Sequence, residues 1–138
     1  MTEPVWLSRQ VMLLLHAEGL AEHGGLDGVR DPGMLDSAMA RPQNLMAYEG
    51  ETNLCRLAAA YAFGLAKNHP FADGNKRAAF IAAVVFLELN GISVDVPEAE
   101  AIAAVLDLAA GELPEAGFAA WLSDNTTARL RDDTAPRT

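Results

Sequence analysis

HPFADGNKRAAFIAAVVFLELNG, residues 69–91, joins a cluster of polar side chains to the most apolar segment of the chain. Between residues 78 and 89, Glu88 is the one charged residue. A helix that is apolar on every side belongs in the interior of a protein, and Asn90-Gly91 is a typical helix stop. We therefore predict a central, buried helix that begins within residues 69–77.

Helical patterns on both sides of this segment predict an all-α fold of about six helices. Apolar residues recur there at helical spacing, and the expected starts carry an N-cap residue or a proline. These signals predict further helices over residues 8–22, 32–42, 53–68, 97–111 and 114–122.

Three other segments lack a helical pattern. Residues 43–52 follow Pro42, which is expected to end a helix, and are predicted to be a connecting loop or an extended flap that docks a target. ISVDV, residues 92–96, is too short to build a sheet and is predicted to be a lone extended piece. The polar residues 123–138 are predicted to be a disordered tail behind a helical domain of residues 1–122.

Composition limits the class of protein. The 138 residues fit one domain. The formal charge of −9 argues against a nucleic-acid-binding domain and suits a basic partner. The single cysteine, Cys55, excludes an internal disulfide. The first residues lack a basic signal-peptide region, and no apolar run reaches the about 20 residues that a membrane span needs, so we expect a cytoplasmic protein without a membrane partner.

Residues 69–77 have a plain structural interpretation. Asp-Gly-Asn is common turn chemistry, Asp73 could simply cap the buried helix, and Arg77 could be a surface residue. The alternative is an anion site, because the start of a helix presents unpaired N–H groups and the positive end of the helix dipole. In that case Gly74 allows a phosphate to approach, Asn75 offers an amide donor, and Lys76 and Arg77 add positive charge.

Two further side chains would turn this anion site into a phosphate-transfer site. Asp73 supplies the hard oxygen ligand that Mg²⁺ prefers beside phosphates. His69 has an ordinary pKa of about 6.5 and suits removal of a proton from a hydroxyl. A base, a metal ligand and an anion cradle in one loop favour phosphate transfer.

HPFADGNKR resembles the signature of the Fic/Doc family, His-Pro-Phe-x-Asp-Gly-Asn-x-Arg, at every fixed position. GLDGVRDPGMLDSAMARPQN and VVFLELNG extend the resemblance to the death-on-curing, or Doc, branch over roughly residues 5–122. The resemblance implies that His69 is the base, that Asp73 holds Mg²⁺, and that Gly74, Asn75 and Arg77 hold the phosphates of ATP. Phe71 is expected to pack under the loop, and Pro70 to stiffen its start.

The sequence departs from the AMP-transferring members of the family at two positions. Those proteins usually have glycine where this chain has Lys76, and a second arginine where it has Phe80. In Doc toxins the lysine-bearing motif is associated with reversed ATP and with transfer of the γ-phosphate to a protein threonine or serine. Elongation factor Tu is the known type of target, so translation would stop. AMP or nucleotidyl transfer, and an inert module that binds only an antitoxin or a nucleotide, remain as alternatives.

The resemblance also implies a protein partner. Many Fic proteins carry an inhibitory helix with Ser/Thr-x-x-x-Glu-Gly or Glu-Asn, and this sequence lacks that pattern. In the Doc branch the inhibitor is a separate antitoxin whose disordered segment folds onto the toxin.

The remaining candidate residues favour plain roles. His16 is expected to be packed or at the surface, with no evident partner. Arg30 and Asp31 are expected to form a salt-bridged helix start, with Arg30 facing the pocket as the alternative. The histidines and Cys55 fall at no metal-ligand spacing.

Overall fold

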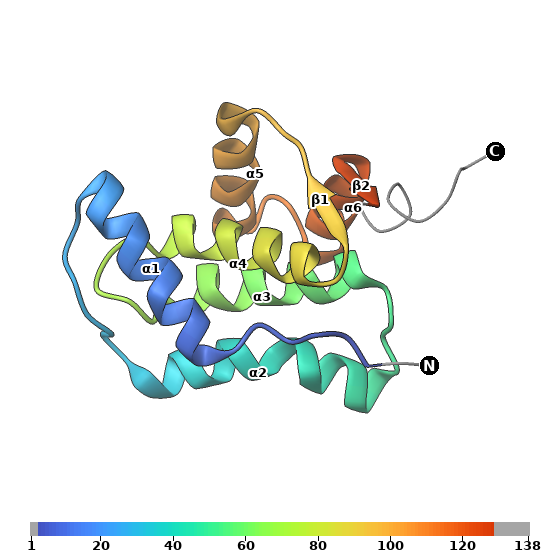
Figure 1. The fold of residues 1–138 in the computed structure, drawn as a ribbon, viewed down its shortest axis with the longest axis horizontal. Coiled ribbons are helices and arrows are strands. Elements are labelled where there is room, and N and C mark those ends of the chain that lie inside the picture. Colours follow the sequence, from blue (N-terminus) through green and yellow to red (C-terminus); the bar gives the residue numbers. More distant parts are fainter. Residues whose placement is uncertain (1–2, 129–138) are drawn as a thin grey trace.

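The computed structural model describes residues 3–128 and confirms the all-α class (Figure 1). Within these residues the chain forms six helices and one small antiparallel pair of strands. The elements are α1 (Arg9–His23), α2 (Pro32–Glu49), α3 (Leu54–Asn68), α4 (Asn75–Leu89), β1 (Ile92–Val94), α5 (Glu98–Ala110), α6 (Glu115–Asp124) and β2 (Thr126–Ala128).

Several helices begin at the capping residues that the sequence predicted. The Ser8 hydroxyl accepts a hydrogen bond from the Val11 N–H at 3.1 Å and caps α1. The Asn53 side chain caps α3 through the Arg56 N–H at 3.0 Å. These caps satisfy N–H groups that have no partner inside the helix.

Helices α3 and α4 form the centre of the molecule (Figure 1). Alanines along both helices are buried and let the neighbouring helices approach closely. Gly64 of α3 has the same effect, because a Cβ atom there would lie 3.1 Å from the Ala38 Cα of α2. The predicted central helix α4 is confirmed, but α3 is buried over more of its circumference. One face of α4, which includes Phe80 and Ile81, is only partly buried and lines a pocket.

The end predicted for the second helix at Pro42 is wrong. Helix α2 continues through this proline to Glu49, and Gly50 ends it in a left-handed conformation with φ of 71°. Proline removes one helical hydrogen bond, but Pro42 is fully buried and α2 packs along α3. Packing therefore holds the helix together, and residues 43–49 are not a flap.

The predictions for residues 92–96 and for the start of the tail are also wrong. Strand β1 pairs with β2, with Ile92 opposite Ala128 and Val94 opposite Thr126. The Asp95 N–H continues the pairing by donating to the Asn125 carbonyl at 2.8 Å. The first residues of the predicted tail therefore form the end of α6, its C-cap Asn125 and strand β2. The remainder of the predicted tail, residues 129–138, lies outside the described residues.

No helix within residues 3–128 is both long and apolar enough to cross a bilayer.

Candidate active site at the start of helix α4

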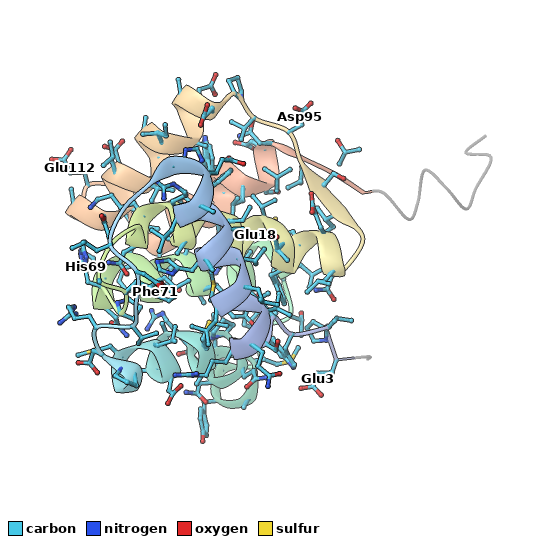
Figure 2. All side chains as sticks on the ribbon, turned by 60° about the vertical axis from the view of Figure 1, so that its left-hand side comes forward. Glu3, Glu18, His69, Phe71, Asp95 and Glu112 are labelled. Atoms are coloured by element: carbon cyan, nitrogen blue, oxygen red, sulfur yellow. The ribbon has the colours of Figure 1, made fainter. Side chains whose placement is uncertain are left out.

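The loop between α3 and α4 begins with an unusual backbone conformation at His69. This residue ends α3 with φ of 49° and ψ of 55°, and among residues 3–128 it is the one non-glycine residue with positive φ. Such a conformation costs an ordinary residue about 1–2 kcal/mol. Figure 2 shows His69 at the edge of the molecule and Phe71 farther inside. The backbone thus turns a histidine outward at the start of the loop.

Arg30 holds this turn in place. Its guanidinium donates to the His69 carbonyl oxygen at 2.6 and 2.9 Å and to the Asn68 carbonyl oxygen at 3.1 Å. The positive charge lies at the negative end of the α3 dipole, which stabilises it. The expected Arg30–Asp31 salt bridge is wrong, because Arg30 caps the end of α3 and Asp31 caps the start of α2.

The segment between α1 and α2 pairs with the motif loop through its backbone. Val29 forms an antiparallel bridge with Phe71. The N–H groups of Arg30 and Asp31 both donate to the Pro70 carbonyl, at 2.7 and 3.0 Å, and the Ala72 N–H donates to the Gly28 carbonyl at 3.0 Å. Pro70 itself is buried. The loop is thereby fixed along its length by a segment about forty residues earlier in the chain.

Phe71 and Asn75 close the loop from below. Phe71 is 1% exposed, and its ring stacks on that of His16. The Asn75 side-chain oxygen accepts from the Phe71 N–H at 2.9 Å, and its amide nitrogen donates to the Phe71 carbonyl at 3.0 Å. Both ends of this buried amide are engaged. What Asn75 can offer an anion is therefore its backbone N–H rather than the side-chain amide expected from the sequence.

The start of α4 has the features of an anion site. Gly74 is the N-cap, with φ of 76°, and no side chain caps the helix. The interpretation of Asp73 as the cap of this helix is therefore wrong. The first-turn residues Asn75, Lys76 and Arg77 present N–H groups without helical partners, and the Lys76 and Arg77 side chains are exposed. The Arg77 side chain lies close to Gly74: a Cβ atom on Gly74 would be 3.4 Å from Arg77 Nη1.

Asp73 presents an exposed carboxylate beside this helix start. Its Oδ1 accepts from the Gly74 N–H at 2.8 Å and its Oδ2 from the Leu26 N–H at 3.3 Å. The bond from Gly74, then the bond from Leu26, and to a smaller extent the charges of Arg77 and His16 lower the pKa of Asp73. The group is thus an anion at neutral pH, as a metal ligand must be.

The donor set fits magnesium. Mg²⁺ is commonly held by one or two carboxylates together with the phosphates of a substrate. An ionised carboxylate has about four lone-pair positions, so Asp73 keeps free positions beside its two hydrogen bonds. No group of three His, Cys, Asp or Glu side chains in the described part of the chain could hold a metal by itself. Asp73 is therefore suited to a metal that arrives with a nucleotide.

Gly25 gives the carboxylate its space. A Cβ atom at this position would lie 2.9 Å from Asp73 Oδ2, and its φ of 129° also disfavours other residues.

A pocket of about 660 Å³ opens beside this site, between α1, α4 and α5. Gly74, Lys76 and Arg77 line one part of it, and Phe80 and the apolar face of α5 line another. Small-molecule sites in proteins have volumes of about 300–1,000 Å³. The pocket is therefore large enough for a nucleotide.

The loop contacts of two side chains were not predicted from the sequence. Arg30 binds the end of α3, and His16 of α1 is buried against Phe71. Their contacts join residues 39 and 57 positions apart. Such pairs leave no mark in a local pattern.

Comparison with known proteins places the residues of this loop in a known family. The family model described as Fic/DOC family matches residues 6–87, which include all of the motif. A protein named Protein kinase doc, from Escherichia phage P1, is 39% identical over 93 residues, 67% of this chain and 74% of its own length. A protein named Toxin Doc, from Mycolicibacterium smegmatis, is 41% identical over 132 residues, 87% of this chain and 96% of its own length. The chain therefore belongs to the Fic/DOC family, and within it to the Doc-type toxins.

Proposed function

We propose that this Doc-type toxin transfers the γ-phosphate of ATP to a hydroxyl group of a target protein, with ADP as the leaving group. The observation that carries the proposal is the loop itself, in which an outward-facing histidine lies in one rigid turn with an ionised aspartate and a lysine-bearing helix start. The name of the phage P1 relative, a protein kinase, supports the same reaction. By resemblance, the target is of the elongation factor Tu type, and its modification arrests translation.

Each loop residue has a distinct role in this reaction. His69 accepts the proton of the target hydroxyl, from a backbone position that Arg30 fixes. The N–H groups of the first turn of α4, with Lys76 and Arg77, bind and orient the phosphates. Asp73 holds Mg²⁺, which neutralises phosphate charge when it is bound.

The wall of the pocket favours phosphate transfer over AMP transfer. At the position where AMP-transferring relatives have a second arginine, Phe80 lines the pocket. The centroid of its ring lies 6.4 Å from that of the Trp121 ring. Ile102 and Leu106 of α5, 54% and 46% exposed, extend this apolar part. Such a surface suits a nucleoside better than a terminal phosphate, so the phosphates belong at the Lys76 end.

A Doc-type toxin also implies a toxin–antitoxin system. The antitoxin is therefore a partner of this chain, and we propose that its disordered segment folds onto the toxin.

The proposed role of Asp73 predicts a metal effect without a folding effect. Asp73→Asn keeps the shape and one acceptor oxygen but removes the charge. Loss of an outer-shell partner of a metal costs about 10–100-fold in affinity, so loss of the ligand itself should weaken Mg²⁺-dependent ATP binding at least as much. Calorimetric titration of ATP at several Mg²⁺ concentrations measures this. Because the carboxylate is exposed, the melting temperature should stay close to that of wild type. Unchanged magnesium dependence would remove the metal role.

Lys76 separates the two enzyme reactions, and its replacement tests the proposal. Wild type should add phosphate to elongation factor Tu, and Lys76→Gly should lower that rate about 10²-fold, the typical effect of removing one electrostatic stabiliser. Intact mass of the target distinguishes phosphate from AMP. Glycine also weakens a helix by about 1 kcal/mol, so Lys76→Ala is the control that removes the long cationic side chain without that backbone effect. If wild type adds AMP, the nucleotidyl transferase alternative is correct and the kinase proposal is wrong.

A further inference from the structure

His16 and Asn75 are buried polar side chains, and both contact the motif loop. Asn75 belongs to the motif, whereas His16 comes from α1, 57 residues before Asp73. The motif assigns no role to the imidazole of His16, but its contacts with the loop indicate one.

The imidazole of His16 makes two contacts with the loop. Its ring stacks on Phe71 with centroids 3.7 Å apart and an angle of 8° between the planes. Its Nε2 lies 2.8 Å from the Asp73 carbonyl oxygen. A carbonyl oxygen only accepts hydrogen bonds, so Nε2 carries a hydrogen and donates. This nitrogen is consequently not available as a second base.

The bond to the Asp73 carbonyl also determines where the next N–H lies. The carbonyl of Asp73 and the N–H of Gly74 belong to one planar trans peptide, so they lie on opposite sides of the chain. With the carbonyl held by His16, the Gly74 N–H donates to Asp73 Oδ1 at 2.8 Å. Rotation of this peptide would exchange the N–H for a carbonyl oxygen, which repels both the carboxylate and a phosphate.

Glycine makes such a rotation feasible. Gly74 has φ of 76°, and glycine occupies positive and negative φ about equally well. Asp73 is exposed and lies outside α4, so helical hydrogen bonds do not fix its carbonyl. His16 is the side chain that holds it.

We propose that His16 is a positioning residue that locks the Asp73–Gly74 peptide with its N–H toward the Asp73 carboxylate. This hydrogen bond keeps the Asp73 carboxylate and the Gly74 N–H in a fixed relative orientation before any ligand binds. The inference rests on the proposed binding of Mg-ATP at Asp73. The state of the peptide itself is measurable without nucleotide.

Three variants distinguish the effect of the Nε2–H donor of His16 from the effect of its ring. His16→Phe keeps a ring that can stack on Phe71 and removes the donor. His16→Gln and His16→Met have nearly the same shape, but only glutamine can donate to the Asp73 carbonyl. If the phenylalanine variant fails to fold, the glutamine and methionine pair still isolates the hydrogen bond.

The first measurement is amide hydrogen exchange of the full-length protein without nucleotide. Loss of the donor should make the Gly74 amide exchange about tenfold faster in the phenylalanine and methionine variants than in wild type. The glutamine variant should stay within about threefold of wild type. Equal Gly74 protection in the glutamine and methionine variants would overturn the proposal.

The second measurement is Mg-ATP binding by the same variants. The dissociation constant should rise about 10–100-fold in the variants without the donor, the range for partners that orient a metal ligand. A merely structural role predicts a lower melting temperature with unchanged affinity of the folded protein, which would also overturn the proposal. If wild type does not bind Mg-ATP, the proposed function fails, and the Gly74 exchange rates alone decide the role of His16.

Discussion

Replacing His69 by alanine should lower the rate of phosphate transfer about 10²–10⁴-fold, the usual contribution of a positioned general base. Mg-ATP affinity should change much less, because the proposed phosphate and metal contacts lie at Asp73 and at the start of α4. Single-turnover rates with saturating ATP, together with calorimetric ATP titration, separate the two effects.

The backbone at His69 calls for a matched control. His69 has φ of 49°, a conformation in which histidine and asparagine are both enriched. His69→Asn therefore preserves the turn and a polar side chain but removes the base. It should be as inactive as the alanine variant while melting at nearly the wild-type temperature. Transfer at the wild-type rate by the asparagine variant would exclude His69 as the base.

Replacing Asn75 by alanine should cause the largest loss of stability in the loop. The substitution leaves the Phe71 N–H and carbonyl without their partners, which lie 2.9 and 3.0 Å away in the native protein. Each buried polar group without a partner costs about 1–3 kcal/mol, so for two groups the free energy of unfolding should fall by about 2–6 kcal/mol. A small domain has about 5–15 kcal/mol in total. Urea unfolding followed by circular dichroism measures the change.

An aspartate at the same position provides the control. Asn75→Asp keeps an acceptor for the Phe71 N–H, but an ionised carboxylate cannot donate to the Phe71 carbonyl and is repelled by it. The protonated acid can donate, so folding should raise the pKa of this new carboxyl. Its stabilising contribution is then present at low pH and lost as pH rises through that pKa. Relative to wild type at each pH, the variant should therefore be more stable in acid. A difference that does not vary with pH would contradict the assigned hydrogen bond.

The sequence predicted the parts of the fold that depend on neighbouring residues. The caps at Ser8 and Asn53 are made within the first turn of their helices, so their local patterns were sufficient. Pro42 was misleading because its effect depends on burial against α3, a tertiary contact that outweighs local preference. Strand β1 was missed as part of a sheet because its partner, β2, is a polar segment more than thirty residues away.

In the candidate site, too, local features could be predicted and contacts between distant residues could not. The motif residues are contiguous, so their position at the start of a buried helix could be predicted. All of α2 and α3 lies between Arg30 and His69 and between His16 and Asp73, and no local pattern pairs these residues. Asn75 was expected to donate to an anion, whereas its side chain holds the loop that makes the anion site.

The contacts that build this site also determine when during synthesis it can exist. A nascent chain contains all of the motif once residue 77 has been added. At that stage it lacks α6, whose Phe118 and Leu122 are fully buried and which packs on α3, the helix that ends at His69. It also lacks β2, the partner of β1. Contacts between residues far apart in the chain form late in folding. The packing that supports the motif can therefore form only after the chain has been extended well beyond residue 77.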